Sequence, residues 1–127
     1  MRKVKFQLVK VVVSEAGEQV RFNAETDKLY DRVTGLYVFT PYYRYNTGST
    51  IELKIAEEEI FPEGFDTKII ASNMSVSPSQ RFYTFENDEE IMAKGNLVSG
   101  KYSDGGNESG IAYPYTMTLV LKLKKDS

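Results

Sequence analysis

The feature that most constrains the fold is the alternation of apolar and polar residues in segment 111–124. Thr116, Thr118, Lys122 and Lys124 occupy one set of alternate positions, with Val120 as the exception. The other set is apolar and consists of Tyr113, Tyr115, Met117, Leu119, Leu121 and Leu123. Because successive side chains of a strand point to opposite faces, this pattern predicts a long β-strand with one buried face. Pro114 cannot donate a ladder hydrogen bond, so it predicts an edge strand or an unpaired beginning.

Other segments show shorter versions of the same pattern, separated by turn residues. In segment 50–56, Ile51, Leu53 and Ile55 are predicted to face inward while Glu52 and Lys54 face solvent. The segments predicted as strands are 4–13, 19–23, 28–40, 50–56, 65–73, 81–85, 91–98 and 111–124. No segment has the periodicity of an amphipathic helix. About eight strands at short spacing predict one all-β domain over residues 1–127, an antiparallel β-sandwich of jelly-roll type.

The first predicted strand contains a change of phase. Its apolar residues are Val4, Phe6 and Leu8 in the first half and Val9, Val11 and Val13 in the second. A shift of one residue moves side chains to the opposite face. We therefore predict that Val4, Phe6 and Leu8 face the core, with a bulge or a passage between two sheets near Val9.

The composition excludes most catalytic chemistry. The chain has no Cys and no His, so it has no disulfide, no thiol nucleophile and no Ser-His-Asp or Cys-His centre. Zinc sites built on thiolate or imidazole are excluded for the same reason. Carboxylate pairs alone carry little information because the chain has 18 acidic residues. We predict a non-enzymatic protein with no catalytic residue, no metal site and no cofactor.

Charge and hydropathy limit the partners. The net charge is −2 and the isoelectric point is about 5.2, which argues against nucleic-acid binding. Lysines gather near both ends, whereas segments 57–59 and 88–90 are acidic, as expected for solvated surface or for complementary patches between copies. No apolar run is long enough to span a bilayer, and Lys5 and Lys10 interrupt any signal-peptide pattern. These observations predict a cytoplasmic protein unless a particle carries it.

The best candidate binding residues are Tyr42, Tyr43, Arg44 and Tyr45, which follow Pro41. Tyr and Arg are enriched in interface hot spots. The segment is expected either to cap the end of the core or to form a contact surface. In the second case it would bind another copy, other structural proteins or the rings of a glycan.

Two polar segments contain candidate metal ligands. Segment 57–66 is rich in Glu but lacks the spacing of a Ca²⁺ loop, and a solvated hairpin with Phe61 and Phe65 turned inward is expected. Segment 99–110 is the most loop-like stretch of the chain. Within it, residues 103–109 contain Asp104 and Asn107 among glycines, and a flexible surface loop is expected.

The layout resembles the small single jelly-roll proteins found in virus and phage particles. The resemblance runs from strand 4–13 to strand 113–123 and includes strand 50–56 and the Ile-Phe-Pro-Glu-Gly-Phe hairpin at 60–65. It implies a virion structural or capsid-associated assembly component that acts as a homo-oligomer. The alternative is a carbohydrate-binding module, in which the tyrosines stack on sugar rings and Asp104 and Asn107 bond the hydroxyls.

Overall fold

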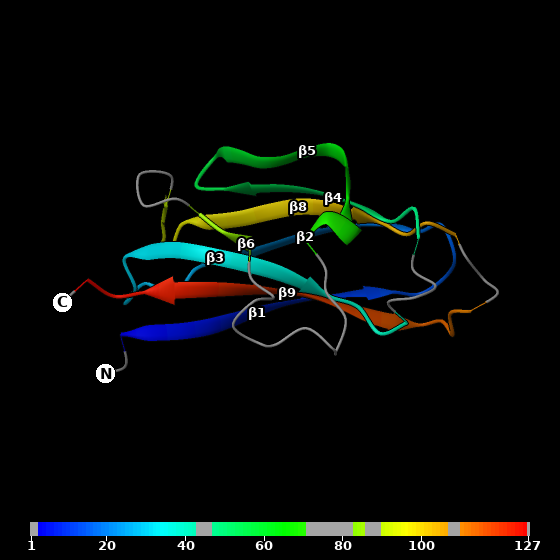
Figure 1. Cartoon of the computed structure of the whole chain (residues 1–127), viewed down its shortest axis with the longest axis horizontal. Helices are drawn as coiled ribbons and strands as arrows, with labels where there is room; N and C mark the ends of the chain where they lie inside the picture. Colours follow the sequence, from blue (N-terminus) through cyan, green and yellow to red (C-terminus); the bar gives the residue numbers. More distant parts are fainter. Residues whose placement is uncertain (1–2, 43–46, 71–82, 86–89, 107–109, 127) are drawn as a thin grey trace.

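The computed structural model describes residues 3–42, 47–70, 83–85, 90–106 and 110–126. Two antiparallel sheets pack face to face in these residues (Figure 1). Within the same residues there is no α-helix, only a single 3-10 turn, η1 (Thr67–Ile69). The strands are β1 (Val4–Val13), β2 (Gln19–Glu25), β3 (Arg32–Phe39), β4 (Thr50–Ile55), β5 (Glu58–Asp66), β6 (Tyr83–Thr84), β7 (Ile91–Met92), β8 (Leu97–Ser103) and β9 (Tyr115–Lys124).

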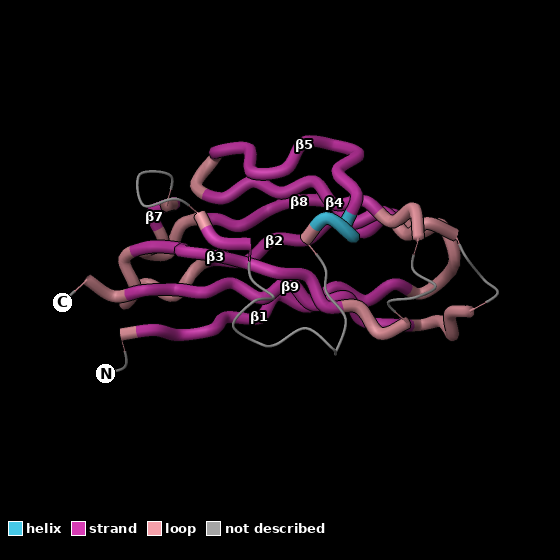
Figure 2. Tube along the Cα trace, viewed as in Figure 1, coloured by secondary structure: helices cyan, strands magenta, loops and turns pink. Residues whose placement is uncertain are grey.

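The strand order identifies the sandwich as a jelly roll. Sheet A has the order β1-β9-β3-β6, with β7 also pairing with β3, and sheet B has the order β2-β8-β4-β5 (Figure 2). The first half of the chain thus pairs with the second half: β1 with β9, β2 with β8, β3 with β6 and β7, and β4 with β5. A long antiparallel ribbon rolled into two sheets has this connectivity. The predicted sandwich is therefore confirmed.

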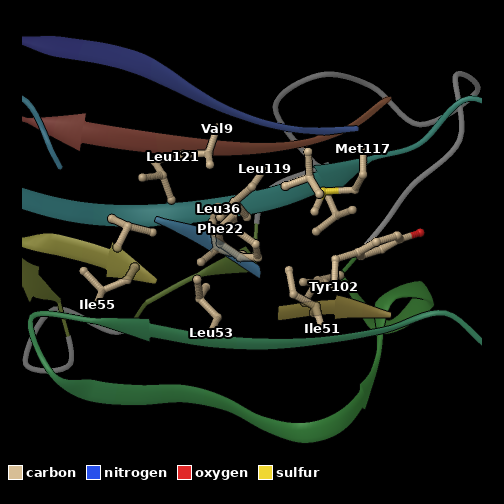
Figure 3. Packing of buried hydrophobic residues seen from close by; sticks show 14 of the residues in the cluster. Val9, Phe22, Leu36, Ile51, Leu53, Ile55, Tyr102, Met117, Leu119 and Leu121 are labelled. Atoms are coloured by element: carbon tan, nitrogen blue, oxygen red, sulfur yellow. The ribbon is translucent and has the colours of Figure 1, made fainter. Parts of the chain in front are cut away.

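The core lies between the two sheets and is apolar (Figure 3). Ile51, Leu53 and Ile55 of β4 are fully buried, as predicted. The predicted inward row of β9 is also buried from Tyr115 to Leu123. β9 lies between β1 and β3, so the edge position considered for it is wrong. Its unpaired beginning is correct, because the strand starts directly after Pro114.

The phase of β1 differs from the prediction. Val9, Val11 and Val13 are buried, but Val4, Phe6 and Leu8 face solvent, and the register with β9 is unbroken over all ten residues. The prediction of a bulge near Val9 is therefore wrong.

Polar partners explain this phase. The inward positions Lys5 and Gln7 meet the connection between β2 and β3. Lys5 forms an ion pair with Asp27, and the Gln7 amide donates to the Glu25 carbonyl at 2.7 Å. Gln7 Oε1 also accepts from the Asp27 N–H at 3.0 Å. Because their polar groups are satisfied in this orientation, the strand keeps one phase throughout.

Two further expectations for strands need correction. β5 ends at Asp66, and η1 follows it, capped by the Asp66 carboxylate, so no strand continues to Ile70. Positions 71–73 lie outside the described residues. The segment expected to be most loop-like begins inside β8, a central strand of sheet B. A Cβ atom on Gly100 would lie 2.0 Å from the Glu52 carbonyl oxygen, so this glycine permits close packing within the sheet.

Two other strands were predicted approximately. β3 is shorter than expected, and its register with β9 shifts between Val33 and Gly35. The predicted strand 91–98 is divided by a turn at Lys94 and Gly95, both of which have positive φ values. The turn carries the chain from β7 in sheet A to β8 in sheet B.

Candidate functional site

The structure places one of the four predicted contact residues. Tyr42 follows the end of β3, has 40% of its surface exposed and adopts a left-handed conformation with a φ of 65°. Tyr43, Arg44 and Tyr45 lie outside the described residues. The proposed aromatic contact surface at residues 42–45 therefore stays a prediction.

A second apolar surface lies on β1, and three of its four residues were assigned to the core by sequence analysis. We call Val4, Phe6, Leu8 and Val12 the β1 stripe. Phe6, Leu8 and Val12 are 55%, 53% and 55% exposed. All four side chains lie on the outer face of sheet A, because the intervening odd-numbered residues turn inward.

The outer face of sheet A is also apolar next to the β1 stripe, but it is buried there, since Val120 is only 6% exposed. Leu8 is opposite Val120 of β9, which in turn is opposite Tyr37 of β3. Lys10 and Lys122 lie on the same outer face, since each is in register with an outward position. The exposed apolar side chains of β1 are therefore interrupted and flanked by lysines: Lys10 lies between Leu8 and Val12, and Lys122 lies opposite Phe6.

The backbone of β1 adds a second property to this surface. The Lys125 N–H donates to the Lys3 carbonyl at 2.7 Å, so odd-numbered residues direct their hydrogen-bonding groups toward β9. By the alternation of an antiparallel ladder, the N–H and C=O groups of even-numbered residues such as Leu8 and Lys10 point away from β9. Among the residues that the structure describes, β9 is the only strand paired with β1. The β1 stripe thus lies along a sheet edge.

A buried carboxylate, Asp104, lies where β8 ends and β9 begins. Asp104 is 7% exposed and accepts four hydrogen bonds. The donors are the Tyr115 hydroxyl at 2.6 Å, the Tyr113 hydroxyl at 2.7 Å, the Gly17 N–H at 2.9 Å and the Gly106 N–H at 3.0 Å. The expected flexible surface loop is therefore wrong at Asp104, while positions 107–109 lie outside the described residues.

The protonation states of this network follow from its hydrogen bonds. Burial acts to raise the pKa of Asp104, but the bonds from Tyr115, Tyr113 and the two glycine amides outweigh it and lower that pKa below the ordinary value. Burial, followed by the bond to Asp104, raises the pKa of Tyr115. The carboxylate is thus ionised and the phenol neutral at physiological pH. Since four protein donors occupy the Asp104 oxygens, the network connects the β1–β2 turn to the start of β9.

The acidic hairpin predicted at 57–66 contains β5, which is the edge strand of sheet B opposite β2. Glu58, Glu59, Glu63 and Asp66 are exposed on β5. Phe61 is buried and stacks on the half-buried Phe65, with ring centroids 4.3 Å apart, as the inward orientation predicted. Within the described part of the chain, no group of three acidic side chains is arranged to hold a metal ion.

Comparisons with protein-family models, with curated proteins and with solved structures found no match to this chain. No helix in the described ranges is long and apolar enough to cross a membrane. What can be assigned is a class of fold: a jelly-roll sandwich with an apolar strip along one sheet edge.

Proposed function

We propose that this protein is a non-enzymatic structural or assembly component that acts through protein–protein contacts. The observation that carries the proposal is the β1 stripe, in which Phe6, Leu8 and Val12 each expose more than half of their surface. Contiguous apolar side chains with a polar surround are typical of interaction sites. Covering them stabilises a complex by roughly 25 cal/mol for each Å² removed from water.

Within this class, we propose the role of a subunit or accessory component of a virus or phage particle. Two features support it. One is the resemblance of the sequence layout to small virion jelly rolls. The other is the strand order, since capsid proteins are among the proteins built on the jelly roll.

The carbohydrate-binding alternative is favoured by Tyr42 alone. Its ring is partly exposed beside the end of β3 and offers a stacking surface. Glycan-array binding that is lost in Tyr42→Ala and retained in Leu8→Ser would support this alternative. If the wild-type protein forms an oligomer but binds no glycan on the array, the carbohydrate-binding alternative is wrong.

The assembly function is tested by measuring molar mass against concentration with light scattering. The wild-type chain is expected to form a defined oligomer, and the Leu8→Ser variant is expected to dissociate because it removes apolar surface at the centre of the β1 stripe. The matched control is Leu97→Ser, which changes a 51% exposed leucine at the start of β8. A wild-type monomer at every concentration overturns the proposal.

A further inference from the structure

We infer that β1 pairs with β1 of a second copy across a two-fold axis, so that two copies of sheet A form one continuous antiparallel sheet. The inference rests on the proposed assembly function and names its partner, a second copy of this chain. It follows from a comparison of the sheet edges and from the positions of the apolar residues and lysines along β1.

The edge at β5 is unsuited to strand pairing. It carries four exposed acidic side chains and Pro62, which has no N–H to donate. Its pairing with β4 shifts register twice, between Ile51 and Leu53 and between Leu53 and Lys54. Charge, proline and irregular register are the devices by which proteins keep sheet edges from joining.

The remaining described edges are also protected. β6 and β7 have two residues each, too few to template a ladder. The outward positions of β2 are polar and exposed: Gln19, Arg21, Asn23 and Glu25. β1 is different, because it offers ten residues in unbroken register with apolar outward side chains. Within the described structure, the strand best suited to pair with β1 is therefore β1 of another copy.

The β1 sequence is compatible with such pairing when the axis passes at Leu8. Antiparallel pairing about this point places Leu8 opposite Leu8 of the second copy and Val4 opposite Val12. Phe6 then lies opposite Lys10, which brings an ammonium group beside an aromatic ring and separates the lysines. An axis at Lys10 would instead oppose two lysines, which is unfavourable. The charge pattern thus favours the register centred on Leu8 over the one centred on Lys10.

This register can be tested by cross-linking because the chain has no cysteine. Opposed residues of an antiparallel pair have Cα atoms roughly 4.5–5.5 Å apart, within the range that a disulfide spans. A Leu8→Cys variant is therefore expected to form an intermolecular disulfide under mild oxidation. Leu97→Cys is the matched control, because Leu97 is equally exposed but lies in sheet B.

A second pair of variants tests the register itself. Val4→Cys and Val12→Cys are each expected to stay uncross-linked, since the two copies of either position lie about 27 Å apart at ~3.4 Å per residue. Mixing these two variants is expected to produce a disulfide-linked heterodimer on a non-reducing gel. All four positions are exposed, and circular dichroism checks that each variant keeps the β fold.

The outcomes separate the two proposals. Cross-linking at position 8 several-fold above the control, together with the mixed heterodimer, supports the β1 contact. A wild-type oligomer in which position 8 cross-links no faster than position 97 overturns this inference and leaves the assembly function with another surface. A wild-type monomer overturns both.

Discussion

The two long edge strands, β1 and β5, differ in how well they could pair with a strand of another molecule. β5 has Pro62, two register shifts and four exposed carboxylates, all of which discourage a neighbouring strand. β1 has a regular ladder and outward Phe6, Leu8 and Val12. The two strands lie at opposite sides of the molecule in Figure 1. The contrast indicates that one edge of this sandwich is closed to partners and the other is suited to receive one.

The largest effect on association is expected from making β1 resemble β5. Leu8→Glu removes apolar surface and, in the proposed pairing, sets two carboxylates opposite each other. We expect association to weaken by about tenfold or more, while the free energy of unfolding of the monomer changes by less than ~0.5 kcal/mol because Leu8 is exposed. Light scattering and urea titration measure the two quantities.

The converse change supplies the control for that prediction. Glu59→Leu removes a charge from β5 but leaves Pro62 and the register shifts in place. No new association is expected. If Glu59→Leu gains as much affinity for a second copy as Leu8→Glu loses, the difference between the two edges is one of charge alone.

Neutralising a buried carboxylate should lower the free energy of unfolding far more than neutralising an exposed one. Asp104→Asn keeps the shape but removes the charge that four donors share, and each bond to a charged group contributes about 1.5–3 kcal/mol. We expect a loss of about 3 kcal/mol in the free energy of unfolding, allowing for bonds that the amide retains. Glu59→Gln on β5 should change it by less than ~0.5 kcal/mol. Equal effects of the two substitutions would contradict a special role for Asp104.

The same carboxylate gives stability a dependence on pH. Because the pKa of Asp104 is lower in the folded state, its contribution is complete above the unfolded pKa and is lost as pH falls through the folded one. Lys5 likewise lowers the pKa of Asp27, and the Asp126 N–H lowers that of Asp31. Urea midpoints should therefore fall with acid in the wild type. In Asp104→Asn the fall should be smaller but still present, and an unchanged slope would argue against the assignment.

Sequence patterns predicted the fold where local alternation decides it. Ile51, Leu53 and Ile55 could be assigned because only one face of their strand is apolar. In β1 both faces hold apolar residues, and the phase is decided by Lys5 and Gln7, whose partners lie at the end of β2 and in the connection that follows it. Local reading of the sequence therefore placed Val4, Phe6 and Leu8 on the wrong face.

The remaining misses have the same origin. Gly100 signals a loop in sequence but provides close packing in a central strand. Asp104 belongs to a glycine-rich segment, and it can be buried because the hydroxyls of Tyr113 and Tyr115, which follow later in the chain, donate hydrogen bonds to its carboxylate. The spacing of the two tyrosines was visible as part of an inward row, but their polar ends indicated no partner. The contact surface at residues 42–45 stays a prediction.

The smallest expected effect concerns the hairpin that presents β5. Ala56 and Glu57 both have positive φ values, 54° and 66°, in a two-residue turn that favours Asn followed by Gly. The double variant Ala56→Asn, Glu57→Gly should relieve this strain and raise the free energy of unfolding by about 0.5–1 kcal/mol, measured by urea titration. Association should be unchanged, because the turn leads into the edge that is closed to partners. A gain in association without a gain in stability would show that β5 takes part in the contact and that the two edges do not differ as proposed.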